Sequence, residues 1–382
     1  MRVKAIIGAN YGDEGKGLAT DYLTGPDSLV VRFNGGAQAG HTVCTPSGQR
    51  HVFSHIGAGS FRGADTFLSC YFIVNPRLYV QEYWALHGMG VNARVLVSPD
   101  AMVTTPFDVM LNHAVEAKRR HGSCGAGINE TVTRSLSSTD VMVTVADLWN
   151  PVDYEKKLKY IAHDYAHARA RALGVLLPPH DIAKLIGVSL EEAALTTERI
   201  TMEETPLRRW LRLGRDVVFE GAQGLCLDED SRDFPHVTRS RTGVTNVLRL
   251  LDAESLQHEP VHAFYMSRTY ATRHGNGPLP DEVPSHPFSW TGPETNVENK
   301  FQGHFRYGVL DAASMGHRIR LDADRSSRVA AYLGVTCCDQ AVLNLSGAIS
   351  EASNIPLIFE SHGPSRASVK LHVKESLISR MA

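Results

Sequence analysis

The chain has 382 residues, of which 43% are apolar and 21% are charged, and this is ordinary usage for a globular protein with a sizeable core. Its formal net charge of −2 gives no overall attraction to nucleic acid or to a membrane surface, so any bound phosphate must be held by local groups. No apolar run of about 18 residues occurs, and the first residues lack the apolar stretch of a signal peptide. We therefore expect neither a membrane span nor a secretion signal.

The predicted elements alternate along the chain. Short apolar runs predict buried strands at residues 3–7, 29–33, 93–97, 217–219, 261–266, 341–345 and 356–359. Stretches with helical spacing of apolar residues include 106–119, 153–172 and 205–213. This alternation predicts an α/β fold with a mainly parallel central sheet flanked by helices. No linker is visible, so we expect one elaborated domain over residues 1–382, and its most loop-like segment is 274–308.

The six cysteines indicate a reducing compartment. They show no Cys-x-x-Cys spacing, and the neighbours Cys337 and Cys338 are poor disulfide partners. Free thiols in the cytoplasm are the expectation.

The segment after the first predicted strand, GDEGKG at residues 12–17, has the composition of a P-loop-like phosphate-binding loop. Its glycines let backbone N–H groups approach an anion, the helix expected from about Leu18 points its positive end there, and Lys16 adds a mobile cation. The usual Gly-x₄-Gly-Lys-Ser/Thr spacing is not met, and Asp13 lies inside the loop. Asp13 fits either as a Mg²⁺ ligand beside phosphates or as a base that removes a substrate proton. The alternative is a glycine-rich turn with a solvated charge cluster.

Two further strands run into glycine-rich turns. The first turn contains His41 among small residues, and the second contains Gln223. Turns that follow neighbouring parallel strands meet at one crevice at the carboxyl edge of the sheet. A lone histidine is more often structural, but the small neighbours of His41 leave the backbone open to a ligand. The Gln223 amide suits the edge of a purine, and the alternative is a turn-capping amide.

Five segments, in this order, resemble those of the adenylosuccinate synthetase family: GDEGKG (12–17), VVRFNGGAQAGHTV (30–43), FEGAQG (219–224), HVTRS (236–240) and YATRHGNGPLPDEV (270–283). Each motif alone is moderately specific, but five in family order over most of the chain are specific. The resemblance implies a carbon–nitrogen ligase that joins L-aspartate to a 6-oxopurine nucleotide. In that reaction the N1 proton is removed, O6 is phosphorylated by a nucleoside triphosphate, and the amine of aspartate displaces the phosphate at C6.

The resemblance also implies roles for individual residues. The expected catalytic residues are Asp13, Lys16, His41 and Gln223: the N1 base, a phosphate ligand, a group that stabilises or protonates the transferring phosphoryl, and a purine-orienting amide. The expected Mg²⁺ ligands are Asp13 and the Gly40 carbonyl. The expected triphosphate site comprises Gly12, Glu14, Gly15, Lys16, Gly17, Gly40, His41, Thr42, Asn344 and Ser346. The expected purine nucleotide site comprises Asp13, Gln38, Ala39, Ser123, Cys124, Arg134, Gln223, Leu225, Thr238 and Gly243. The expected aspartate site comprises Thr295, Asn296, Gln302, Gly303 and Arg306.

Partners follow from the same resemblance. Thr238 and, across the interface of a homodimer, Arg134 are expected on the nucleotide 5′-phosphate. Only small-molecule substrates are expected besides the second subunit, and no nucleic acid or membrane.

Three departures from the family pattern bear on the substrates. The aspartate-binding loop, rich in Thr and Arg in the family, reads ETNVENKFQGHFRYGVLD here and keeps only Arg306, which is still able to grip a carboxylate or else forms a surface ion pair. The segment AVLNLSG lacks the aspartate that pairs with guanine, so ATP or dATP is the expected donor and GTP the alternative. Gln38 stands where the family usually has Asn.

The compact loop is most similar to the archaeal and phage branch, which includes phage 2-aminoadenylosuccinate synthetases that act on dGMP. The phage enzymes commonly replace the loop aspartate, which this chain retains. We expect dGMP as the acceptor, with IMP as the alternative, and a host cytoplasmic location if the chain is phage-encoded. An inactive nucleotide-binding regulator and a simple P-loop hydrolase are readings from other classes. Retention of Asp13, Lys16, His41 and Gln223 argues against the regulator, and the missing Ser/Thr after Lys16 argues against the hydrolase.

Overall fold

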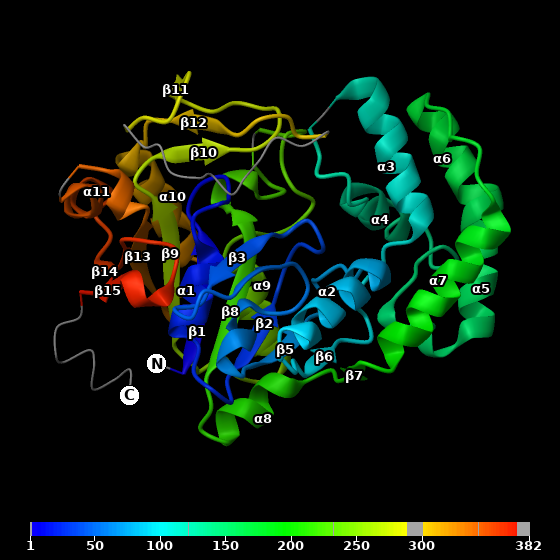
Figure 1. Cartoon of the computed structure of the whole chain (residues 1–382), viewed down its shortest axis with the longest axis horizontal. Helices are drawn as coiled ribbons and strands as arrows, with labels where there is room; N and C mark the ends of the chain where they lie inside the picture. The colour runs from blue at the N-terminus through cyan, green and yellow to red at the C-terminus, as the bar shows by residue number, and fades with distance from the viewer. Residues whose placement is uncertain (1, 121, 232, 289–300, 343, 373–382) are drawn as a thin grey trace.

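The computed structural model describes residues 2–120, 122–231, 233–288, 301–342 and 344–372. Within them, one ten-stranded sheet has the strand order β15-β14-β13-β9-β1-β8-β2-β5-β6-β7 (Figure 1). Its strands are β1 (Val3–Gly8), β2 (Leu29–Arg32), β5 (Asp65–Leu68), β6 (Val95–Val97), β7 (Ile200–Met202), β8 (Val217–Gly224), β9 (Val261–Arg268), β13 (Val329–Thr336), β14 (Leu357–Ser361) and β15 (Val369–Leu371). Neighbouring strands are parallel, except that β15 runs antiparallel to β14. The predicted fold class is confirmed.

Helices cover both faces of this sheet. They are α1 (Lys16–Leu23), α2 (Pro76–Gly88), α3 (Pro106–Arg119), α4 (Ile128–Ser135), α5 (Pro151–Tyr160), α6 (Ala166–Leu173), α7 (Ile182–Thr197), α8 (Pro206–Arg212), α9 (Thr245–Ala253), α10 (Ala312–Ala323) and α11 (Leu345–Ser353). A π-helical turn, Ile161–Tyr165, joins α5 to α6. In the described part of the chain, no helix combines the length and apolarity that a bilayer span requires.

The buried strands read as continuous apolar runs because both of their faces are covered. Successive side chains of β1 point to opposite faces: Ala5 and Ile7 pack with residues of α8, α9 and α10, whereas Ile6 packs with residues of α1. A third apolar cluster joins β5 and β6 to α2, α3, α5 and α7, the helices on the right of Figure 1.

Two small sheets lie outside the central one. Strand β3 (His41–Cys44) pairs with β4 (Arg50–Phe53). Strand β12 (Arg306–Gly308) pairs with β10 (Ala271–Arg273) and β11 (Glu282–Val283). Because β10 follows β9 after two residues, this second sheet stands over the carboxyl end of the central strands, at the top of Figure 1. The segment expected as a loop at 274–308 therefore contains strands.

The predicted strand at residues 341–345 is wrong. Asn344 is the N-cap of α11, which begins at Leu345. The strand that occupies this part of the sheet is β13, and its first residues, Val329–Tyr332, are only partly buried. This strand was not predicted from the sequence, although residues 329–333, VAAYL, form an apolar run.

Candidate functional site

The three glycine-rich turns meet at the carboxyl edge of the sheet. A Cβ atom on Gly8 would lie 2.4 Å from the Gln223 carbonyl oxygen, and one on Gly224 would lie 2.4 Å from the carbonyl oxygen of Asn10. Only glycine allows the first and third turns to approach so closely. The Asn34 side chain fixes the second turn to the third, since its Oδ1 accepts from the Ala222 N–H at 2.7 Å and its amide donates to the Ala222 carbonyl at 3.1 Å.

Glu14 is the internal anchor of the first loop. Its Oε1 accepts from the backbone N–H groups of Asn10 at 3.0 Å and Gly12 at 2.8 Å, and its Oε2 accepts from Lys16 Nζ at 2.8 Å. Both side chains of the Glu14–Lys16 pair are buried. Lys16 is therefore not the mobile cation that the sequence suggested. In this conformation the ammonium and two loop amides are bound to Glu14, which explains how an acidic residue fits within such a loop.

Asp13 is turned away from that anchor. Its φ of 61° lies in the left-handed region, which is uncommon for non-glycine residues but is adopted by Asp and Asn more often than by most others. Its carboxylate is partly exposed and lies 3.8 Å from His274 Nε2, while its carbonyl accepts from Arg268 Nε at 2.6 Å. Gly15 is close to the end of β13, because a Cβ there would lie 2.8 Å from the Thr336 side chain.

His41 begins β3 and packs on the first turn of α1, where a Cβ on Gly17 would lie 2.9 Å from the His41 Cβ. Its Nδ1 lies 2.5 Å from Glu220 Oε1, and Glu220 Oε2 accepts from the Ala58 N–H at 2.9 Å. Burial, reinforced by Arg32 and Lys16, lowers the pKa of His41 against the opposing effect of Glu220. Burial alone would raise the pKa of Glu220, but Arg32 and His41 outweigh it and lower that pKa.

Glu220 and Arg32 are functional candidates that the sequence reading missed. Each interrupts an apolar strand, VVFEG and LVVRF, and each is 0% exposed. A charge inside a buried strand needs a partner, and Arg32 Nη1 lies 3.6 Å from Glu220 Oε1. A charged residue inside an otherwise apolar strand is therefore a sequence signal by which Glu220 and Arg32 could have been found.

The side-chain amides of Gln38 and Gln223 lie near one another, and buried atoms in both have no partner among the described residues. Measured from the position of a Cβ on Gly35, Gln38 Nε2 is at 3.3 Å and Gln223 Oε1 at 3.8 Å. Both amide atoms of Gln38 and Gln223 Oε1 are buried and have no hydrogen-bond partner among the described residues. A buried polar atom without a hydrogen-bond partner lowers stability by roughly 1–3 kcal/mol, and a ligand that offers both donors and acceptors would supply the missing partners.

Other expected nucleotide residues border these turns to different degrees. Ser240, in the HVTRS segment with half-buried Thr238, accepts from the Gly35 N–H through Oγ at 3.2 Å. Ala39 is buried in the second turn, half-buried Thr42 lies next to His41 in β3, and half-buried Leu225 directly follows β8. Gly243 is instead a packing position, since a Cβ there would lie 2.1 Å from the Asp322 carboxylate.

The loop with Ser123 and Cys124 lies against the 275–276 turn. A Cβ on Gly122 would be 2.8 Å from the Asn276 nitrogen, and one on Gly125 would be 2.6 Å from the Phe301 ring. The nucleotide residues expected in this loop therefore border the segment expected to bind aspartate.

Arg134 is buried within its own subunit in this structure, and its predicted contact with the nucleotide of a partner subunit stays a prediction. Its side chain is 0% exposed. Nε donates to Asp108 Oδ1 at 2.8 Å, while Nη2 donates to Asp108 Oδ2 at 2.9 Å and to the Val103 carbonyl at 2.8 Å. Nη1 donates to the Val141 carbonyl. Asp108 also forms the capping box of α3 with Thr105, so Arg134 ties α4 to the start of α3.

Arg306 is held within the upper sheet. Its guanidinium pairs with Glu282 through Nε at 2.7 Å, and Nη1 donates to the carbonyls of Gly275 at 3.0 Å and Gly277 at 2.9 Å. The alternative reading, an ion pair near the surface, describes this conformation. Gln302 and Gly303 are half-buried just before it, whereas Thr295 and Asn296 lie outside the described residues.

A carboxylate does lie beside the expected donor pocket. Ser346 Oγ, on the first turn of α11, donates to Glu360 on β14. Exposed Asn344 caps the same helix with φ 63°. This carboxylate lies outside residues 341–347, the segment from which ATP or dATP was expected as donor, and the identity of the donor stays a prediction.

Two groups at the edge suit a hard cation. Asp13 offers a partly exposed carboxylate, and Gly40, an exposed residue, offers a backbone carbonyl; both are oxygen ligands, which Mg²⁺ prefers.

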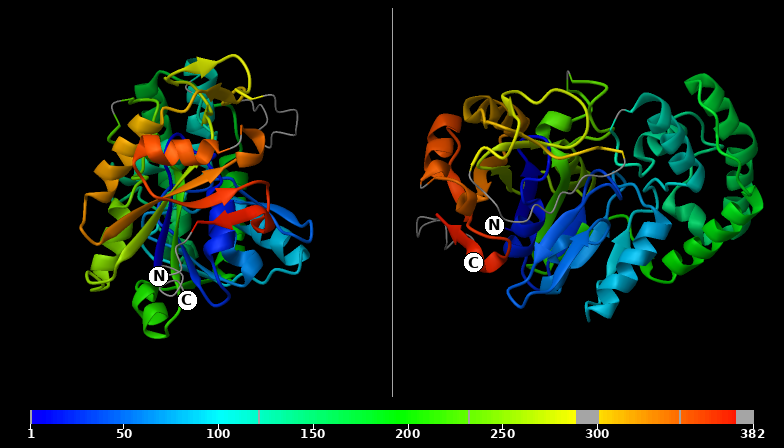
Figure 2. Two further views of the ribbon diagram at one scale, coloured as in Figure 1. Left: turned by 90° about the vertical axis from the view of Figure 1, so that its left-hand side faces the viewer. Right: turned by 45° about the horizontal axis from the view of Figure 1, so that its top comes forward.

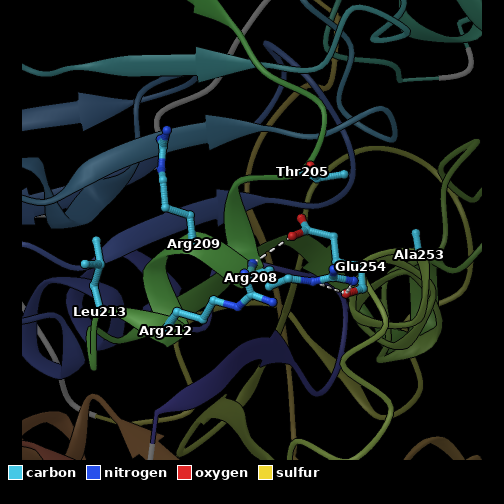
Figure 3. A pocket seen from close by; sticks show the side chains of 7 residues that line it. All are labelled: Thr205, Arg208, Arg209, Arg212, Leu213, Ala253 and Glu254. Carbon is cyan, nitrogen blue, oxygen red and sulfur yellow. Dashed lines mark hydrogen bonds between the residues drawn. The ribbon is translucent and has the colours of Figure 1, made fainter.

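A cavity of about 410 Å³ lies elsewhere, beside α8 at the bottom of Figure 1 (Figure 3). Two of its three arginines are engaged: Arg208 Nε donates to the Glu254 carbonyl at 2.7 Å, and Arg209 pairs with Glu203 at 2.8 Å. Since α8 precedes β8, the cavity is at the amino edge, opposite the glycine-rich turns.

Comparisons with known proteins agree with this architecture. The sequence profile described as adenylosuccinate synthetase matches residues 5–325. The adenylosuccinate synthetase of Cyanothece sp. is 30% identical over 73% of this chain, and that of Mycobacterium leprae is 29% identical over 74%. The matches span 62% and 65% of those two relatives, less than two thirds of their length.

Solved structures share the fold. The adenylosuccinate synthetase of Plasmodium falciparum superposes with a TM-score of 0.81 at 18% identity, covering 98% of this chain and 100% of that one. The succinoaminodeoxyadenylate synthetase of cyanophage S-2L, bound to dGMP and dATP, gives 0.70 at 16% identity and covers 99% and 97%. Because the family profile matches residues 5–325, most of this chain, the chain belongs to the adenylosuccinate synthetase family.

Proposed function

We propose that this protein is a carbon–nitrogen ligase that joins L-aspartate to C6 of a 6-oxopurine nucleotide. One observation carries the proposal: partly exposed Asp13, His41 held by Glu220, and the unpartnered amides of Gln38 and Gln223 gather where three strand-to-glycine turns meet. A site of this kind offers a base, a proton-exchanging imidazole and unpartnered amide atoms that could bind a purine, all at one edge of the sheet.

The proposed roles follow from the chemistry at C6 of the purine, where the 6-oxo group is a poor leaving group until it is phosphorylated. Asp13 removes the N1 proton, and O6 attacks the γ-phosphorus of the triphosphate, releasing the diphosphate. The aspartate amine then adds at C6 and inorganic phosphate leaves, which gives the succinylated nucleotide. His41 stabilises or protonates the phosphoryl oxygens as their charge changes. Gln38 and Gln223 orient the base.

Mg²⁺ would be held by the Asp13 carboxylate and the Gly40 carbonyl, and when bound it neutralises charge on the phosphates. Lys16 and the loop amides become phosphate ligands only if the Glu14 contacts exchange. Phosphate binding is therefore accompanied by a rearrangement of this anchor.

The acceptor we propose is dGMP, with ATP or dATP as donor. The compact ETNVENKFQGHFRYG segment supports this choice, as does the shared fold with the cyanophage enzyme, whose structure holds dGMP and dATP. IMP is the second candidate, because Asp13 is retained and the matched curated relatives are adenylosuccinate synthetases. GTP is the second donor, because Glu360 lies beside Ser346.

One assay tests both the ligase activity and the choice of acceptor and donor. The purified protein is incubated with L-aspartate, Mg²⁺ and each pair of acceptor (IMP, GMP, dGMP) and donor (ATP, dATP, GTP), and products are identified by mass spectrometry. We expect an aspartate-dependent succinylated product from dGMP, and less from GMP if the site selects against a 2′-hydroxyl. A product from IMP alone would replace the acceptor and keep the ligase. Triphosphate hydrolysis that ignores aspartate would overturn the ligase itself.

A further inference from the structure

A buried glutamate on α2 holds the hairpin that carries His41. The Oε1 atom of Glu82 accepts from the Ser54 N–H at 2.9 Å, while its Oε2 accepts from the His55 N–H at 2.7 Å and from Ser54 Oγ at 2.6 Å. Ser54 and His55 directly follow β4, so α2 is bound to the end of the β3–β4 hairpin. The blue hairpin and the lighter-blue α2 lie side by side in Figure 1 and in the right panel of Figure 2.

Glu82 acts here as an ionised acceptor. Burial alone would raise the pKa of Glu82, but contacts with His51 and His55 outweigh burial and lower that pKa. An ionised carboxylate only accepts hydrogen bonds, and bonds of this kind are stronger than those between neutral groups. His55 is also held from its other side, because its Nε2 accepts at 3.0 Å from the N–H of Asn75, the N-cap of α2. The residues after β4 are therefore fixed to α2 at two points.

Two short routes lead from these residues to His41. Along the first, Phe53 at the end of β4 is paired with His41 in the hairpin. Along the second, Ala58 lies four residues after Ser54, and its N–H donates to Glu220 Oε2 at 2.9 Å. The other oxygen of Glu220 lies 2.5 Å from His41 Nδ1. The stretch that begins at Phe53 and ends at Ala58 therefore borders both the backbone of His41 and the carboxylate that orients its ring.

We propose that Glu82 is a positioning residue for His41, which it orients through the residues that follow β4. Apolar packing of this stretch is not directional, whereas three hydrogen bonds to one buried side chain fix where it lies. A displacement of about 1 Å at a reacting group lowers a rate by as much as about 10²-fold. The expected effect on turnover rests on the ligase function proposed above, but the expected effect on the His41 ring does not.

The test compares Glu82→Gln with Glu254→Gln. Glutamine keeps the shape of the side chain but turns one acceptor oxygen into a donor, which then faces another donor. Glu254 is the matched control, because it is also buried and accepts from two successive N–H groups, those of Leu207 at 3.0 Å and Arg208 at 2.7 Å, but lies at the amino edge of the sheet. We expect Glu82→Gln to lower kcat by about tenfold or more, with each KM within about threefold, and Glu254→Gln to retain its turnover.

Nitrogen NMR of the histidine rings supplies a measurement that needs no activity. Because burial lowers the pKa of His41, its ring is neutral at about pH 8, and the facing carboxylate should keep the proton on Nδ1. The His41 signals are assigned by their loss in His41→Asn. We expect Glu82→Gln to shift them towards the other tautomer and Glu254→Gln to leave them unchanged. If the wild type joins aspartate to no nucleotide, the proposed function fails, and these spectra still decide the present inference.

Urea unfolding of each variant separates a folding defect from a displaced hairpin. If Glu82→Gln does not fold, Ser54→Ala replaces it, because it removes one hydrogen bond to Glu82 from a half-buried residue; it should lower kcat by about threefold and shift the same His41 signals. Since Glu82 acts through Glu220, the loss of kcat in the variant that carries both Glu82→Gln and Glu220→Gln should be smaller than the product of the two separate losses. Equal turnover in Glu82→Gln and Glu254→Gln, unchanged His41 signals, or losses that simply multiply would overturn the proposal.

Discussion

His41 Nδ1 lies 2.5 Å from Glu220 Oε1, and both side chains are buried. A carboxylate accepts hydrogen bonds and does not donate them, so Nδ1 carries the proton and Nε2 is the nitrogen left to exchange one with a substrate. The second oxygen of Glu220 is held by the Ala58 N–H, which fixes the orientation of the pair.

Glu220→Gln should therefore lower turnover by about 10²-fold or more, because an amide donates to Nδ1 and selects the other tautomer. Nucleotide affinity, measured by calorimetry, should change much less. Arg32 loses its countercharge in this variant, so unfolding must be measured alongside and the assay run where the variant is folded. Turnover within a few-fold of wild type would show that His41 works without Glu220.

Asp13→Asn should abolish turnover while nucleotide binding survives. The shape of the side chain is kept, but a base and a metal-binding charge are lost, each worth about 10²–10⁴ in rate. Asp27→Asn is a matched control, because Asp27 is also an aspartate in the left-handed region, with φ 64°, but it is exposed and remote from the turns. Near-normal turnover of Asp13→Asn, or equal losses in both variants, would remove Asp13 from the chemistry.

The sequence predicted the parts of the fold that are encoded locally. Strands β1, β2 and β9 were located to within two residues, because buried parallel strands are apolar on both faces. Strand β13 was missed although VAAYL at residues 329–333 is an apolar run; its two alanines weaken the strand signal, because alanine is less common in strands than β-branched residues are. Asp13, His41 and Gln223 were expected to lie close together because each is in a glycine-rich turn after a strand, and such turns meet at the carboxyl edge of a parallel sheet.

Contacts between segments that are distant in the sequence could not be predicted. Ser346 reaches Glu360 only because α11 packs beside β14, and no local sequence pattern predicts this contact. The role expected of Arg134 came from the family resemblance alone, and no local pattern predicts that its guanidinium is buried against Asp108.

Gln38→Leu should weaken acceptor binding by about tenfold or more and leave the free protein as stable as before, or slightly more stable. The reason is that both amide atoms are buried without partners, so an apolar side chain of similar size removes an unsatisfied group from the free protein and a hydrogen bond from the complex. Urea unfolding and acceptor titration check the two halves. A loss of stability of several kcal/mol would mean that the amide has a structural partner, contrary to the structure.

His262 should make stability depend on pH. Burial lowers its pKa from 6.5 to about 4. The unfolded chain then binds the proton more readily, so the free energy of unfolding falls as pH drops from about 6.5 towards 4. After discounting for partial exposure, the loss is about 1–2 kcal/mol. His262→Phe, which keeps a ring against Tyr332, should remove this part of the pH dependence in urea unfolding at pH 7 and 4.5. His258→Phe, at an exposed histidine, should not.

Arg134→Met should destabilise the fold by about 3–5 kcal/mol, because it leaves the buried Asp108 carboxylate without its cation. Arg169→Met is the matched control. Arg169, on α6, pairs at 2.8 Å with Glu130, which lies on α4 like Arg134, but the Arg169 side chain is 25% exposed, so the loss should be about 1 kcal/mol or less. Denaturant unfolding measures both variants, and nucleotide titration separates the two roles that Arg134 could have. A nucleotide ligand supplied across a dimer interface would lose affinity at unchanged stability. The buried ion pair should do the reverse, and only that outcome agrees with a guanidinium whose three nitrogens already donate within one subunit.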